Sequence, residues 1–242
     1  LLDGATKAEG EFLTTRHADD LAKLPKDLRA TLDVSALCRA VAKAYGTGDG
    51  LYAKGLSQID WRPFLDSMTS GKEMLAFKRT DKGHRQDNQT DAARIIWWMR
   101  KEIVECASLN RDLGDHMLRQ HVSTHLQSTI IVATLYARAI LDDKFTQRSV
   151  FFAASDELKW SLLDMAKFYA CVRKACEIPT DEWESTWLNP DWDIFGDIDE
   201  PAYDRWKLSY LERKACAAQR AELYAPKCAV NVKALPLAVE IL

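Results

Sequence analysis

The feature that most constrains the fold is a helical spacing of apolar residues across residues 92–141. Over many turns one face of this stretch stays apolar, as expected for helices that pack on a core. The chain contains no convincing alternating run of β-branched residues, and 242 residues include only 10 Gly and 7 Pro. A fold built from strands needs many tight turns, which are rich in those two residues. The sequence therefore predicts an all-α protein. The apolar positions are Trp97, Val104, Ala107, Leu118, Val122, Leu126, Ile130, Ala133, Ala137 and Ile140.

Three other stretches show the same spacing. They cover residues 27–45, residues 149–176 and the stretch from Pro201 to about Tyr224. Ser155 is the expected N-cap of the second of them. We expect an irregular bundle of about seven or eight helices, with a long acidic connection near the C-terminus.

We expect residues 1–242 to form a single helical domain. Residues 78–90 contain no large apolar residue, which makes this polar loop the best candidate for an internal sub-boundary. Thr90 or Asp91 is the expected cap of the helix that follows. A further sub-boundary would separate the C-terminal connection and helix, residues 178–242.

Composition and charge exclude several classes of protein. Apolar residues make up 47% of the chain, which excludes general disorder, and the net charge of -3 does not favour a nucleic-acid partner. The longest nearly apolar run, from Ile130 to Leu141, is too short to span a membrane. We therefore expect a soluble protein. The first residues do not resemble a signal peptide, which leaves the compartment and any removed presequence open.

The cysteines form no CxxC pair and lie among apolar residues. We expect them to be small buried side chains in a reducing compartment such as the cytosol or an organelle matrix. We expect no cofactor. The six cysteines are Cys38, Cys106, Cys171, Cys176, Cys216 and Cys228.

A pair of histidines is the best candidate metal site. His121 and His125 are four residues apart, so they project from one side of a helix and border its apolar face. A metal would need further ligands from another helix. The alternative is a pair of histidines with hydrogen bonds at a packing seam.

Arg111 and His116 lie in the sequence NRDLGDH. This stretch resembles the R-x4-6-H signature of HEPN ribonucleases, and the resemblance covers six residues. It implies an all-helical protein that pairs two such motifs across a dimer and cleaves RNA without a metal. On a regular helix the two side chains would point about 140° apart, so they converge only if Gly114 bends the chain. The competing interpretation is a structural ion pair between Arg111 and Asp115.

The most unusual stretch is Thr180–Asp204, which we call the acidic segment. It contains nine acidic residues, no Lys or Arg, and three of the eight tryptophans: Trp183, Trp187 and Trp192. Because indole rings are large and mostly apolar, we expect them to be buried, either against the chain's own helices or against a partner. Carboxylates around a partner-binding indole would favour a partner with a basic surface.

The function we expect is that of a non-enzymatic helical subunit or adaptor of a larger protein assembly. It would bind its partner partly through residues 180–204, with Trp183, Trp187 and Trp192 as contacts. No recognisable nucleophile, dinucleotide or phosphate motif is present. The two alternatives are the ribonuclease that uses Arg111 and His116, and a metal-binding bundle that uses His121 and His125.

Overall fold

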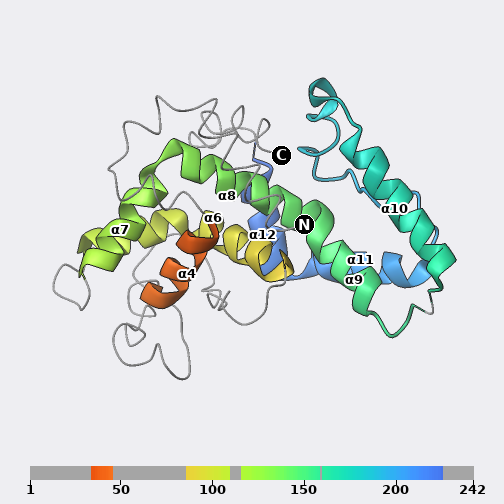
Figure 1. Ribbon diagram of the computed structural model, residues 1–242, viewed down its shortest axis with the longest axis horizontal. Helices are drawn as coiled ribbons and strands as arrows, with labels where there is room; N and C mark the ends of the chain where they lie inside the picture. The colour runs from red at the N-terminus through yellow and green to blue at the C-terminus, as the bar shows by residue number, and fades with distance from the viewer. Residues whose placement is uncertain (1–33, 46–85, 110–115, 159, 226–242) are drawn as a thin grey trace. The chain divides into compact units, whose positions relative to one another are not determined.

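A computed structural model describes residues 34–45, 86–109, 116–158 and 160–225 (Figure 1). These residues are predominantly helical and contain no strand, which confirms the all-α prediction for this part of the chain. None of the helices in these ranges is long and apolar enough to cross a membrane. The α-helices are α4 (Val34–Tyr45), α6 (Gln86–Leu109), α7 (His116–Gln127), α8 (Thr129–Leu141), α9 (Gln147–Ala154), α10 (Leu162–Cys176), α11 (Pro201–Glu212) and α12 (Lys214–Leu223). A π-helix, η1 (Asp142–Thr146), and a 3-10 turn, η2 (Thr180–Glu182), complete these elements.

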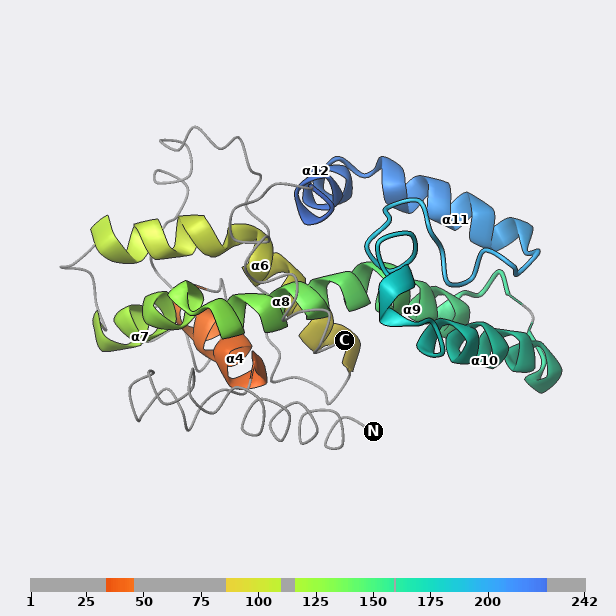
Figure 2. The ribbon, with the colours of Figure 1, turned by 90° about the horizontal axis from the view of Figure 1, so that it is seen from above.

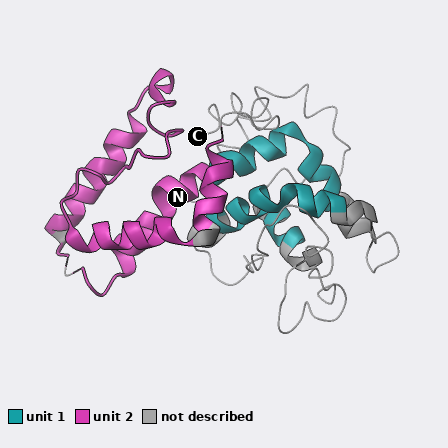
Figure 3. Ribbon diagram, turned by 180° about the vertical axis from the view of Figure 1, so that it is seen from behind, with its two compact units in different colours: residues 1–139, 229–242 teal, residues 140–228 magenta. Residues whose placement is uncertain are grey.

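The chain divides into two compact units (Figure 3). Unit 1 comprises residues 1–139 and 229–242, and unit 2 comprises residues 140–228. Residues 78–85 of the predicted polar loop lie outside the described residues. The last part of that loop is helical, because α6 begins at Gln86. The prediction that Thr90 or Asp91 caps this helix is wrong: both lie inside α6 and are buried.

In unit 1, α4, α6 and α7 contact one another (Figure 2). The apolar periodicity of the sequence explains this packing. Trp97 of α6 and Tyr136 of α8 are both buried, with ring centroids 5.4 Å apart. Nearly every residue from Ile130 to Ile140 is buried, so α8 lies in the interior on most of its circumference.

In unit 2, the single helix expected over residues 149–176 is two helices. Ser155 is extended and ends α9, so its predicted role as an N-cap is wrong. The cap of α10 is Ser161, which forms a capping box with Asp164; the Ser161 backbone N–H donates to Asp164 Oδ2 at 2.8 Å. A short polar side chain competes with the helical backbone for hydrogen bonds, which is why serine occurs at both ends. The helix expected from Pro201 to Tyr224 is likewise broken, at Arg213.

The cysteines in the described residues are all free thiols. Cys38 and Cys216 are buried as expected, and Cys171 is partly buried. Cys176, at the end of α10, is exposed, so the expectation of uniformly buried cysteines is wrong there. Cys106 and Cys228 have side chains outside the described residues.

A cluster of aromatic rings forms the apolar core of unit 2. Phe195 is fully buried, and its ring stacks on Phe168 of α10 at a centroid distance of 4.8 Å. It also meets Phe152 of α9 at 5.2 Å and Tyr203 of α11 at 6.4 Å. Through this one ring, the acidic segment joins three helices that are separate in sequence.

Replacing Phe195 by Ala should lower the free energy of unfolding by about 3–5 kcal/mol, because it leaves a cavity among four aromatic rings. Urea denaturation would measure this change. Leu208→Ala is the control, because Leu208 is 61% exposed and its loss should change the free energy by less than about 0.5 kcal/mol. Equal effects of the two substitutions would contradict the packing described for unit 2.

Candidate functional site

Two of the predicted pairs of site residues fall partly outside the described residues. Arg111 lies in such a stretch, and His116 is the first residue of α7 with its side chain not described. The ribonuclease pair therefore stays a prediction. His121 lies on α7 with its side chain also outside the description, whereas His125 is buried at 3% exposure. Within the described residues, no group of three or more His, Cys, Asp or Glu could hold a metal ion.

The tryptophans of the acidic segment pack on its own unit. Trp183 and Trp187 are 9% and 8% exposed. Their indole nitrogens donate to the carbonyls of Ile178 at 3.2 Å and Ala175 at 3.3 Å, where α10 ends. The ring of Trp192 packs at a tilt against that of Trp187, with 5.5 Å between the centroids, and stays partly exposed. Trp192 is therefore the indole of the three with the most accessible surface.

The site that sequence reasoning missed begins in η1. This π-helical turn follows α8 directly and buries three consecutive charged residues, Asp142, Asp143 and Lys144. A π-turn inserts an extra residue into a helix, and such turns are frequent at functional sites. Gln147 holds Asp142, because its side-chain amide donates to both carboxylate oxygens at 3.2 Å.

Lys144 is fully buried and binds backbone carbonyl oxygens of the acidic segment. Its ammonium donates to the carbonyl oxygens of Asn189, of Pro190 at 3.3 Å and of Trp192 at 2.7 Å. The Nζ atom also lies 5.0 Å from the centroid of the Tyr224 ring. These carbonyls belong to an irregular stretch around a proline, where the Asn189 carbonyl also accepts from the backbone N–H of Trp192 at 3.3 Å. The buried cation supplies donors that a helix or sheet would otherwise provide.

Asp143 connects η1 to the last two helices of unit 2. It forms an ion pair with Arg220 of α12 and accepts hydrogen bonds from the hydroxyls of Tyr224 at 2.7 Å and Tyr210 at 3.2 Å. Arg220 also donates to the carbonyl of Pro190 at 2.6 Å. The same loop of the acidic segment is thus held by two cations, one from η1 and one from α12.

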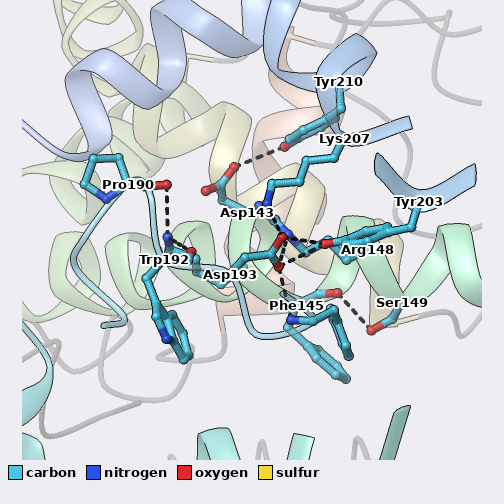
Figure 4. Close-up of polar contacts among 12 residues, drawn as sticks. Asp143, Phe145, Arg148, Ser149, Pro190, Trp192, Asp193, Tyr203, Lys207 and Tyr210 are labelled. Carbon is cyan, nitrogen blue, oxygen red and sulfur yellow. Dashed lines mark hydrogen bonds and ion pairs between the residues drawn. The ribbon is translucent and has the colours of Figure 1, made fainter. Parts of the chain in front are cut away.

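Asp193 is the buried carboxylate of the acidic segment, with a side chain 5% exposed (Figure 4). Arg148 of α9 donates to it at 3.2 Å, Lys207 of α11 pairs with it at 2.6 Å, and the Tyr203 hydroxyl lies 2.9 Å from both oxygens. Its Oδ1 also accepts from the backbone N–H of Phe195 at 3.1 Å. Asp193 is therefore the point where the acidic segment contacts α9 and α11.

The electrostatics follow from burial and from an excess of cations. The pKa of Lys144 is lowered to about 7: burial is the largest cause, Arg148 and Arg220 act in the same direction, and the attraction of Asp143 and Asp193 opposes the shift. Burial by itself would raise the pKa of Asp143, but Arg148 and Arg220 outweigh it and the net shift is downward. Asp143 thus stays ionised in the interior.

The contacts leave most carboxylates of the acidic segment on the outside. Only one of its acidic side chains, Asp193, is inside the network. The exposed acidic residues are Asp181, Glu182, Glu184, Asp191, Asp197, Asp199 and Asp204. The contacts of the buried network therefore leave an irregular acidic surface on the outside of the segment.

The sequence carried one signal for this network. The charged triplet Asp142–Lys144 directly follows the apolar run that ends at Leu141. Charges placed against the end of a core helix are either solvated or paired. The pairing itself has no local signal, because the partners lie 45 to 81 residues further along the chain.

Comparison with known proteins adds no relative. No protein-family model, no curated protein and no solved structure matches this chain.

Lys144→Met should change how stability depends on pH. With a pKa of about 7 in the folded chain and 10.5 in the unfolded chain, Lys144 binds fewer protons when folded. The free energy of unfolding should therefore rise as the pH rises from ~7 to ~9. Urea denaturation across this range should show the rise for the native chain and a smaller rise for the variant.

Lys207→Met is the matched control for that experiment. Lys207 also contacts the network, but its side chain is 30% exposed. This variant should keep the pH-dependent rise. If the Lys144 and Lys207 variants had the same pH dependence as the native chain, the charge of Lys144 would not be coupled to folding.

Asp193→Asn should destabilise unit 2 by about 3–5 kcal/mol, because it leaves the buried Arg148 without its carboxylate. Asp197→Asn is the control: Asp197 pairs with Lys174 at 2.7 Å, but both side chains are more than 70% exposed. Such a pair contributes about 0–1 kcal/mol. Thermal unfolding of the two variants would compare the two effects, and similar midpoints would contradict the role of Asp193.

Proposed function

We propose that this chain is a non-enzymatic helical adaptor or subunit of a larger assembly, which docks a basic protein surface on its acidic segment. The observation that carries this proposal is the orientation of the segment. Trp183, Trp187 and Asp193 face the chain's own helices, while Asp181, Glu184 and Asp191 are exposed. A fixed anionic surface needs no ordering when a partner binds, which lowers the entropic cost of association.

The tryptophans have two roles in this proposal. Trp183 and Trp187 hold the segment on the end of α10 through their buried rings and indole hydrogen bonds. Trp192 is the indole proposed as a partner contact, because it is partly exposed and lies beside the exposed Asp191. Aromatic side chains of this kind are enriched at the energetic centres of interfaces.

The described residues test neither alternative function, because Arg111 and the side chains of His116 and His121 lie outside them. A basic partner would associate faster at low salt, because exposed charges are screened as ionic strength rises.

The test is affinity capture from an extract of the source cells, with the purified chain as bait and quantitative mass spectrometry as readout. Neutralising the segment with Asp181→Asn, Glu184→Gln and Asp191→Asn should release proteins that the native chain retains. Trp192→Ala should weaken the retention of the same proteins by about 2 kcal/mol or more.

The matched control neutralises three exposed carboxylates of unit 2 that lie outside the acidic segment, with Asp156→Asn, Glu157→Gln and Glu212→Gln. The control should retain the same proteins as the native chain. Equal losses in both triple variants would indicate a non-specific charge effect and contradict the proposal.

A further inference from the structure

A second surface of unit 2 lies on α10. This helix packs by one side only, where Phe168 and Ala175 are buried. On the opposite side Leu163 and Tyr169 are 82% and 63% exposed, the highest values among the large apolar side chains described. Ala166 and Ala170 are exposed as well.

The exposed apolar residues of α10 form a line. Leu163, Ala166 and Ala170 are spaced by three and four residues, so they follow one another along one face of the helix. Tyr169 lies at the edge of this face. Because alanine side chains are small, another helix can approach closely at the middle of α10.

Basic residues flank this apolar line on both edges. By helical spacing, Lys167 and Lys174 lie on one side of it and Arg173 on the other, and all three are exposed. Lys174 pairs with Asp197 and Arg173 with Glu177, but the side chains in both pairs are about 70–80% exposed. Exposed pairs of this kind contribute little, so these cations can exchange partners.

The acidic segment runs back along α10 (Figure 1). Trp187 contacts the carbonyl of Ala175, Asp197 pairs with Lys174, and Phe195 stacks on Phe168. The later residues of the segment thus meet earlier residues of the helix. An acidic strip and a basic, partly apolar strip therefore lie side by side in unit 2.

We propose that this surface binds a second copy of the chain, with the acidic segment of each copy on the α10 face of the other. The inference rests on the proposed function, because it identifies the basic surface on which the acidic segment docks. In a two-fold dimer the same contact occurs twice, so each acidic strip meets a basic strip. Charge complementarity favours this occupant over a partner that is basic throughout, which α10 would repel.

The two-fold arrangement would also cover the exposed apolar residues of α10. The acidic segment of one copy then covers Leu163, Ala166 and Ala170 of the other, with Tyr169 at the edge of the contact. Lys167 and Arg173, on the two edges of this face, then lie against the exposed carboxylates of the segment, which include Asp181 and Glu184. Apolar contact supplies the centre of this interface and charge pairs supply its rim, as in known interfaces.

The test measures the mass of the purified chain by light scattering after size exclusion. At low salt the native chain should have twice the mass of its 27.5 kDa monomer, and about 1 M salt should shift it toward the monomer by screening the rim. Two variants reverse one strip each: Asp181→Lys with Glu184→Lys, and Lys167→Glu with Arg173→Glu. Each variant alone should be monomeric.

Combining the two reversals should restore the dimer. An equimolar mixture of the variants should form a heterodimer, because the strips are complementary again, and a chain with all four substitutions should form a homodimer. The control, Asp156→Lys with Glu212→Lys, changes exposed carboxylates outside both strips and should stay dimeric. Leu163→Ser should weaken the dimer without changing any charge, and circular dichroism should show that all variants are folded.

Three results would overturn the inference: a native chain that is monomeric at low salt, single reversals that stay dimeric, or folded variants that fail to pair when mixed. A monomeric native chain that still captures proteins through its acidic segment would disprove the dimer and leave the adaptor function standing. Conversely, charge-swap rescue together with no segment-dependent capture would support the dimer and contradict any other partner.

Discussion

The arrangement of unit 2 depends on buried charge. Taking an ion out of water costs several kcal/mol unless opposite charges and hydrogen bonds replace its hydration. Lys144 and Asp143 are both buried in η1, and one turn of helix cannot satisfy them. Their partners come from the acidic segment and α12. The need to satisfy these two side chains therefore fixes how the following 80 or so residues fold back on η1.

The same constraint explains why an irregular segment has a defined conformation. Pro190 and Pro201 prevent a long helix between α10 and α11, so the backbone of the segment does not form the regular hydrogen bonds of a helix. Lys144 and Arg220 supply donors to this backbone, and Asp193 turns one side chain inward to Arg148. The other carboxylates are left in water. The surface is therefore acidic because Asp193 is the carboxylate that pairs with the buried cations, whereas the other carboxylates face the solvent.

Much of the fold could be predicted from the sequence. The apolar spacing over residues 92–141 identified helices whose buried faces include Trp97, Val122 and Ile130. The errors occurred at helix ends: Ser155 was predicted as the cap, but Ser161 begins α10. The sequence did carry a signal for this cap, because Asp164 follows Ser161 at the spacing of a capping box. The sequence also showed the three tryptophans and the acidity of the segment, but not which indole rings are buried.

The sequence by itself determined the helical class, the apolar faces and the position of the acidic segment, because each depends on residues close together in the chain. Only the tertiary structure decided the network of Lys144, Asp143, Arg148 and Asp193. The hydrogen bonds of Lys144 and Asp143 join residues 45 to 81 positions apart. From the sequence alone, a charged triplet such as Asp142–Lys144 is expected to be solvated surface. Only the packing of the chain shows that these residues are buried away from water. The long-range contacts that then replace this water follow from geometry, which no local pattern encodes.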